Sequence, residues 1–269
     1  MSTLARRSAA PNGASPPNDA VALSRLEARL PPVLSVIAGM VDLTGFFTLG
    51  HVFTAHVTGN LVVAAAAAVE GGPWNLAQAL AIPVFMLALA LVWLIAQASY
   101  RRGPGLARLL LLVQFLLLGA LLGFSVITKP SADPRGLMAG IAVMIAVSAM
   151  ACQYALLRLA MPHAVSTAVM TGNLTNTVLA LMDSLSKHRA LLPLDVGRLK
   201  RSLHLLFGFL LGCVMAAYAV PVLGDWAWLL PVALSGTAFM CFRIRTNAEH
   251  DRGAPSELTP FEANEEPSP

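Results

Sequence analysis

The sequence predicts an all-α integral membrane protein, and three observations lead to this prediction. The chain has 269 residues, of which 57% are hydrophobic and only 12% are charged, about half the charged share of a soluble domain. Its apolar residues gather in runs of about 18 or more, the length that a helix needs to span a bilayer. An eight-residue motif also occurs twice in matching surroundings, which indicates an internal duplication.

Six apolar runs are long enough to cross the membrane as helices. Two further stretches, 52–69 and 164–182, are apolar but are interrupted by small and polar residues. The chain therefore divides into a first membrane repeat, 32–128, and a second membrane repeat, 136–242. The six expected crossings are 32–50, 78–98, 109–127, 136–157, 203–222 and 226–242.

Both ends of the chain are polar and are expected to be disordered, with a short surface helix at 23–30 as the alternative in the N-terminal segment. Residues 1–31 are rich in Pro, Ser and Ala, and no apolar segment follows Arg6 and Arg7 at the distance of a cleavable signal. In the tail, 243–269, lie six of the fourteen acidic residues of the chain. The remainder is basic, but its bases lie between apolar runs, where control of topology explains them better than nucleic-acid binding.

The distribution of Lys and Arg favours six crossings with both termini in the cytoplasm. If all eight apolar segments crossed, four bases would lie outside and fourteen inside. If the two interrupted segments enter and return on the same side, only Lys129 and Arg135 lie outside and sixteen bases lie inside. Re-entrant segments therefore fit better, with eight crossings as the alternative.

The duplicated motif reads Thr-Ala-His-Val-Thr-Gly-Asn-Leu at 54–61 and Thr-Ala-Val-Met-Thr-Gly-Asn-Leu at 167–174. Six of the eight positions are identical at an offset of 113. If both motif segments are re-entrant, each half has three crossings. An odd number of crossings turns the second half upside down, which is the inverted-repeat architecture of many transporters.

The motif residues predict an interrupted helix in each half. Each glycine is a poor helix former, each threonine before it can cap the following helix, and each asparagine can both donate and accept hydrogen bonds. Half-helices would point partly positive N-termini at a solute, although small residues also serve plain helix packing. The residues expected along a solute path are Thr54, Thr58, Gly59, Asn60, Thr167, Thr171, Gly172 and Asn173.

Asp42 is the one acidic residue well inside a predicted crossing. A charged aspartate there costs about 2.5–3.5 kcal/mol on insertion scales, so it is expected to be functional, as a proton or cation coupling site. The alternative is a protonated carboxyl bonded to a neighbouring helix. Gln153 precedes the second motif as Asp42 precedes the first, so we expect the two side chains to be related partners around one cavity.

No residue pattern predicts an enzyme, a metal site or a cofactor. The chain lacks the serine-protease and zinc-protease motifs and a second embedded aspartate. His51 and His56 are five residues apart and do not share a helix face well, so a place at the membrane boundary is expected rather than metal binding. The cysteines, Cys152, Cys213 and Cys241, fall in apolar segments and are expected to be small hydrophobic residues.

Residues 39–42 (Gly-Met-Val-Asp), 52–53 (Val-Phe) and 58–60 (Thr-Gly-Asn) resemble the YoaK family of bacterial multi-spanning membrane proteins. The second half matches through 153–155 (Gln-Tyr-Ala) and 171–173, and the similarity covers about residues 33–242. Cys152 and Tyr154 depart from the family pattern, which has Gly and Asn there. The resemblance implies a bacterial plasma membrane location but no established activity.

Taken together, the residues predict a transporter or channel for a small polar solute, neutral or singly charged, with proton coupling through Asp42 as one mode. A scaffold or lipid-binding protein without flux is the alternative, and an intramembrane enzyme is a weaker one. The expected partners are the lipid bilayer and the solute, and small residues on several helices are compatible with a homo-oligomer.

Overall fold

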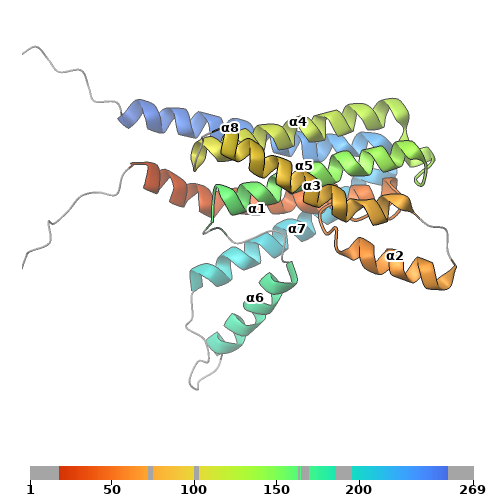
Figure 1. Ribbon diagram of the computed structural model, residues 1–269. Coiled ribbons are helices and arrows are strands. Elements are labelled where there is room, and N and C mark those ends of the chain that lie inside the picture. The colour runs from red at the N-terminus through yellow and green to blue at the C-terminus, as the bar shows by residue number, and fades with distance from the viewer. Residues whose placement is uncertain are drawn as a thin grey trace, which may run out of the picture.

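The computed structural model describes residues 18–71, 75–99, 103–162, 164, 170–185 and 196–253, and these contain helices and no strand (Figure 1). The predicted all-α class is confirmed for this part of the chain. In chain order the elements are α1 (Asn18–Thr48), α2 (Gly59–Glu70), α3 (Leu76–Ala98), α4 (Pro104–Thr128), the 3-10 turn η1 (Pro130–Ala132), α5 (Leu137–Leu159), α6 (Met170–Leu185), α7 (Val196–Leu223), the 3-10 turn η2 (Gly224–Trp228) and α8 (Leu229–Gly253).

Five stretches of the described residues are long and apolar enough to cross a membrane, and α2 is a shorter apolar helix. The last stretch is 44 residues long and contains both α7 and α8, which the sequence predicted as separate crossings. Length and composition thus make the chain a membrane protein with several spans. The five stretches are Arg29–Thr48, Leu76–Ala98, Pro104–Thr128, Leu137–Leu159 and Leu199–Phe242.

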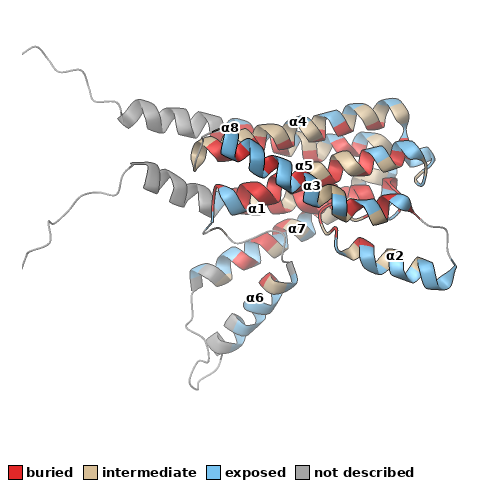
Figure 2. Cartoon of the chain, viewed as in Figure 1, coloured by how far each residue is buried: buried red, intermediate tan, exposed pale blue. Residues whose placement is uncertain are grey.

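Helices α1 and α5 form the centre of the bundle. They are 67% and 72% buried over their spans, whereas α3 is only 17% buried (Figure 2). Helix α1 packs against α5, α7 and α8, and α5 packs against α3 and α4. Helix α4 also packs against α8, while α2 lies on α3 and α6 lies on α7. The apolar side chains exposed on the outer helices are the surface that lipid would cover.

The backbones of α1 and α7 touch because glycines lie where the two helices cross. A Cβ atom on Gly212 would stand 2.1 Å from the carbonyl oxygen of Val36, and one on Gly39 would stand 2.2 Å from that of Phe209. Gly208 and Gly212 are four residues apart on one face of α7, the small-residue spacing that lets membrane helices approach closely. This contact fixes α1, and with it Asp42, against α7.

The terminal helices extend beyond the predicted membrane repeats. Residues 18–31 belong to α1, which includes the alternative short helix at 23–30, and residues 243–253 belong to α8. Each extension continues an apolar helix that packing already holds in place, and in α1 the helix passes through Pro31 and Pro32. The other parts of the two predicted tails, 1–17 and 254–269, lie outside the described residues.

The short helices α2 and α6 lie at opposite ends of the bundle and stand away from it (Figure 1). Helix α2 lies at the end of the bundle that carries η1 and η2. Helix α6 lies toward the opposite end of the bundle, where α3 joins α4. Both helices expose apolar side chains over much of their surface (Figure 2).

Candidate functional site

A break in the helical backbone follows α1 and forms the centre of the site. Helix α1 ends at Thr48, and Gly50 and His51 then adopt positive φ angles of 74° and 60°. Gly50 is required here because a Cβ atom would stand 2.4 Å from the carbonyl oxygen of Pro134. Residues 52–58, which we call the linker segment, run without helical structure until α2 begins at Gly59.

The carboxylate of Asp42 binds the linker segment to α1. Its Oδ1 accepts hydrogen bonds from the backbone N–H groups of Thr54 at 2.8 Å, Ala55 at 2.9 Å and His56 at 3.4 Å. Its Oδ2 lies 2.7 Å from Nδ1 of His56. Free N–H groups at a break in a helix attract an anion, so a buried acid at this place has a clear physical reason.

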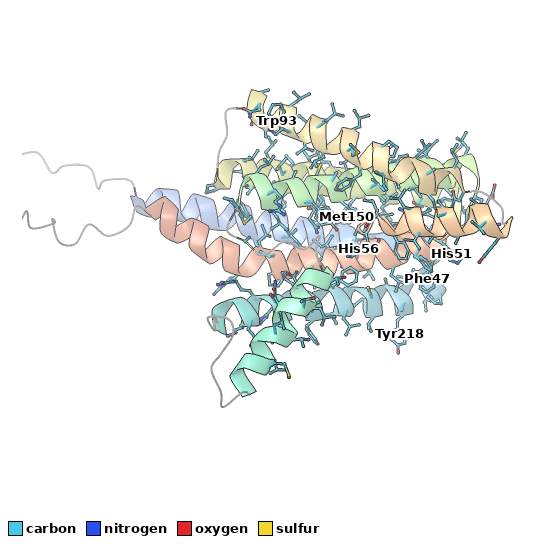
Figure 3. All side chains as sticks on the ribbon, turned by 60° about the horizontal axis from the view of Figure 1, so that its bottom comes forward. Phe47, His51, His56, Trp93, Met150 and Tyr218 are labelled. Carbon is cyan, nitrogen blue, oxygen red and sulfur yellow. The ribbon has the colours of Figure 1, made fainter. Side chains whose placement is uncertain are left out.

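His56 connects this buried carboxylate to the outer surface of the bundle. Its side chain is 29% exposed, whereas that of Asp42 is 7% exposed. The imidazole ring packs edge-on against Phe209 of α7, with ring centroids 5.0 Å apart. Figure 3 places His56 near the middle of the bundle, while His51 and Phe47 lie toward its end.

Two further contacts hold the linker segment against the central helices. The hydroxyl of Thr54 donates to the carbonyl oxygen of Val41 at 3.1 Å, and its methyl group packs over Gly45, where a Cβ would stand 2.9 Å away. The hydroxyl of Tyr154 in α5 donates to the carbonyl oxygen of Ala55 at 2.9 Å. The irregular backbone is therefore paired from α1 and α5, as buried backbone in a membrane protein must be.

Asn60 pairs with both backbone groups of Phe53. The N–H of Phe53 donates to Oδ1 of Asn60 at 2.8 Å, and Nδ2 of Asn60 donates to the carbonyl oxygen of Phe53 at 2.7 Å. Thr58 occupies the N-cap position of α2, but its hydroxyl makes no capping bond, so the predicted capping role is wrong. Its backbone has helical φ and ψ angles of −67° and −25°, whereas a capping side chain normally needs extended ones.

The second motif lies at the start of a helix, as the first does. Helix α5 ends at Leu159 and α6 runs from Met170 to Leu185, so Gly172 lies in the first turn of α6, whereas Gly59 is the first residue of α2. Residues 165–169, which precede α6, lie outside the described residues. A glycine weakens a helix by about 1 kcal/mol but does not forbid it. The hydroxyls of Thr175 and Thr177 donate to the carbonyl oxygens of Thr171 and Asn173 within the helix. Thr167 lies outside the described residues.

The structure thus brings together Asp42, Thr54, Gly59 and Asn60 of the predicted residues, with Thr58 at the edge. Thr171, Gly172 and Asn173 lie in the first turn of α6, which packs against α7. Gln153 is bound elsewhere: its Oε1 accepts from Gln114 at 2.8 Å, and its Nε2 donates to the carbonyl oxygen of Leu34 at 2.9 Å.

Gln153 and Asp42 therefore belong to separate contacts. Leu34 precedes Asp42 by eight residues, which is about 12 Å along a helix at 1.5 Å per residue. At the motif offset of 113 residues, the position that corresponds to Asp42 is Ala155, whose side chain cannot carry a charge. The predicted partnership of Gln153 with Asp42 has no direct contact to support it.

Sequence reasoning missed three participants: His56, Tyr154 and Gln114. The sequence does mark His56, because the two motif copies differ at this position: the first has His56 where the second has Val169. Nothing in the sequence pairs Tyr154 with Ala55 or Gln114 with Gln153, since the two pairs are 99 and 39 residues apart in the chain. Within the described ranges no three His, Cys, Asp or Glu side chains gather in a group that could hold a metal ion.

A comparison with protein-family models gives one match. Residues 30–241 match the model of a family described as a protein of unknown function, DUF1275. The chain belongs to this family. The match agrees with the resemblance to YoaK-like proteins, and the DUF1275 region covers α1 from Leu30 onward, the first half of α8 and everything between them. Searches of curated proteins and of solved structures found no match.

Proposed function

We propose that this DUF1275 protein is a transporter or channel for a small polar solute, neutral or singly charged, built from two inverted repeats with six crossings. The observation that carries the proposal is the pattern of helix packing. If the first four helices α1–α4 correspond in order to the last four, α5–α8, each contact between helices should have an equivalent. The contact α1–α7 has α5–α3 as its equivalent, and α4–α5 has α8–α1. The contact α2–α3 has α6–α7, and all these pairs of helices are in contact.

The directions of the helices favour inversion rather than simple repetition. In Figure 1, α1 runs toward the end of the bundle that carries η1 and η2, whereas α5 runs away from that end. Helices α3 and α7, and likewise α4 and α8, also run in opposite directions. A two-fold axis in the membrane plane relates such halves, and transporters use this architecture to alternate access to a site between them.

The length of the last apolar stretch supports six crossings. Its 44 residues would extend about 66 Å as one helix, more than twice the ~30 Å hydrocarbon core. The turn η2, which begins at Gly224 with a φ of 54°, divides the stretch into α7 and α8. With α2 and α6 re-entrant, both termini lie on one side, which we assign to the cytoplasm of a bacterial cell on the distribution of Lys and Arg.

The break after α1 supports a solute path. Irregular backbone at membrane depth is stable only where protein buries it or where it lines a water-filled space. The linker segment meets the first condition through its contacts with Asp42, while its own residue His56 is partly exposed. A charged carboxylate inside a membrane bundle is a frequent mark of an ion or solute pathway.

Flux through purified protein in liposomes tests the proposal. A panel of small neutral and singly charged solutes should include at least one that enters protein-containing liposomes faster than protein-free ones. Asp42→Asn should abolish that flux, whereas Tyr218→Phe, at a 78% exposed position on α7, should leave it unchanged. Equal flux with Asp42→Asn and the unchanged protein would remove Asp42 from the path.

The alternative is a lipid-binding or scaffold protein without flux. Its support is the unusual exposure of the short helices: Leu61, Val62 and Val69 of α2 are 56%, 71% and 89% exposed. If no solute of the panel moves while a defined lipid remains bound through purification, this alternative replaces the first proposal.

A further inference from the structure

The structure holds one acid–imidazole pair among its described residues, and no role has yet been assigned to the imidazole. We propose that Asp42 and His56 together form a proton-binding site, and that loss of the charge on Asp42 releases the linker segment from α1. This inference rests on the proposed function in one respect, since it names the proton as the coupling ion. The release itself needs no solute.

The linker segment depends on the carboxylate being ionised. One oxygen of Asp42 accepts from the N–H groups of Thr54 and Ala55 at 2.8 and 2.9 Å and from that of His56 at 3.4 Å. An ionised carboxylate accepts through both oxygens, whereas a protonated one becomes a donor at one of them. Hydrogen bonds to a charged acceptor are about twice as strong as those between neutral groups. Protonation therefore weakens the main contact between α1 and the linker segment.

His56 sets how readily that protonation occurs. Its Nδ1 lies 2.7 Å from the second carboxylate oxygen, so a protonated imidazole forms an ion pair of zero net charge with Asp42. A neutral pair is far cheaper to keep in a membrane than a lone carboxylate. The imidazole is also the more exposed partner, at 29% against 7%, so a proton from water reaches the pair through His56.

The surroundings of Asp42 contain few competing groups. Helix α5 contributes the Tyr154 hydroxyl, which donates to the carbonyl oxygen of Ala55, and α7 contributes the Cys213 thiol, which donates to that of Gly39. On η2, Asp225 is bonded to Ser131 in an exposed contact, and η1 has no titratable side chain. Among the described side chains of α8, Cys241 is the titratable one, and it is exposed. His51, beyond the linker segment, packs against Phe46 instead.

Losing or gaining one proton gives the Asp42–His56 pair two further charge states. Starting from the ion pair, a proton lost from His56 to water leaves a net charge of −1 with the linker segment still bound. A proton gained by Asp42 from water leaves a net charge of +1 and frees the three N–H groups. The released state is thus favoured by acid, and removal of the imidazolium must make release easier.

Hydrogen–deuterium exchange of the full-length protein in lipid nanodiscs tests this directly. Peptides covering the linker segment are followed from about pH 8 to about pH 4, the range in which free imidazole and carboxyl groups titrate, with correction for intrinsic exchange. The amides of Thr54 and Ala55 should lose protection roughly tenfold or more as the pH falls, as expected for losing a hydrogen bond to a charged group. Protection that stays constant over this range overturns the proposal.

Variants assign the effect to the pair. His56→Gln should shift the loss of protection to higher pH, because the cation that favours the ionised carboxylate is gone. His51→Asn is the matched control, since it removes a nearby imidazole at a positive φ that Asn tolerates, and it should leave the midpoint unchanged. Asp42→Asn should remove the pH dependence with protection low throughout. If Asp42→Asn does not give a monodisperse protein, His56→Gln still decides.

The outcomes separate this inference from the proposed function. A pH-dependent release that shifts in His56→Gln supports the proton site even if no solute in the panel is transported. Solute flux without any pH dependence of the linker amides keeps the transporter or channel and overturns the proton site. An equal midpoint in His56→Gln and the unchanged protein also overturns it.

Discussion

At the scale of single residues, hydrogen bonds from three side chains hold an irregular backbone inside an apolar bundle. Asp42 binds the N–H groups of the linker segment, Asn60 binds both backbone groups of Phe53, and Tyr154 binds the carbonyl of Ala55. Each removes an unpaired polar group whose burial would cost roughly 1–3 kcal/mol. Asn60 of the first motif therefore has a structural role, because it pairs the backbone of Phe53.

Asn60→Ala is expected to lower the free energy of unfolding by about 2–4 kcal/mol, because it leaves two partly buried backbone groups of Phe53 unpaired. Thr58→Ala is the control, since its exposed hydroxyl makes no capping bond, and its effect should stay within about 0.5 kcal/mol. Thermal unfolding in detergent measures both. Equal losses would show that the Asn60 contacts add nothing to stability.

The buried pair Gln114 and Gln153 predicts a coupled response. Gln153→Leu and Gln114→Leu should each destabilise the protein by about 1–3 kcal/mol, because each leaves the partner amide unpaired at a fully buried site. The double variant should lose less than the sum by about 1 kcal/mol, as found for residues in direct contact. Strict additivity in unfolding experiments would contradict the pairing.

At the scale of elements, small residues decide which helices can touch. Helices α1 and α7 approach until Gly212 has a carbonyl oxygen 2.1 Å from the position of a Cβ. By contrast, Gly119 and Gly123 of α4 have open space around them. The same residue type is thus required at one crossing and free at another.

Gly212→Ala is expected to destabilise the bundle by about 1–3 kcal/mol, since the helices must move apart to admit a methyl group against backbone. Gly119→Ala should be neutral or stabilising by up to about 1 kcal/mol, because alanine is the better helix former and nothing blocks it. Unfolding midpoints in detergent distinguish the two. A stable Gly212→Ala protein would mean that the α1–α7 crossing is looser than described.

At the scale of the whole molecule, the order of helix ends predicts the topology. The junction of α3 and α4 lies at the bundle end opposite η1 and η2 (Figure 1). With six crossings, a position near residue 103 lies on the side of the termini and Ala132 on the other side.

A reporter fused near residue 103 should therefore report the cytoplasm, and Ala132→Cys, in a background without the native cysteines, should react with an impermeant thiol reagent outside. Ala132 is exposed at the end of η1, so the label has access. Labelling of Ala132→Cys in intact cells checks the outer assignment. An external signal near residue 103 would favour eight crossings instead.

The sequence alone determined the all-helical membrane class, the order of the long helices and the place of Asp42 inside the first of them, because hydrophobic run length and a charge within an apolar run are local properties. It also marked the first motif correctly as the place where the helix breaks. It could not tell where the short helix of the second half begins, because Gly172 permits helix and break alike, and α6 begins at Met170.

Only the tertiary structure decided what the polar residues contact. His56 and Asp42 are fourteen residues apart in sequence and Tyr154 is a further ninety-eight from His56, so no local pattern records their convergence. The helix packing that brings them together depends on glycines at one crossing and on side-chain fit elsewhere, which are properties of pairs of helices.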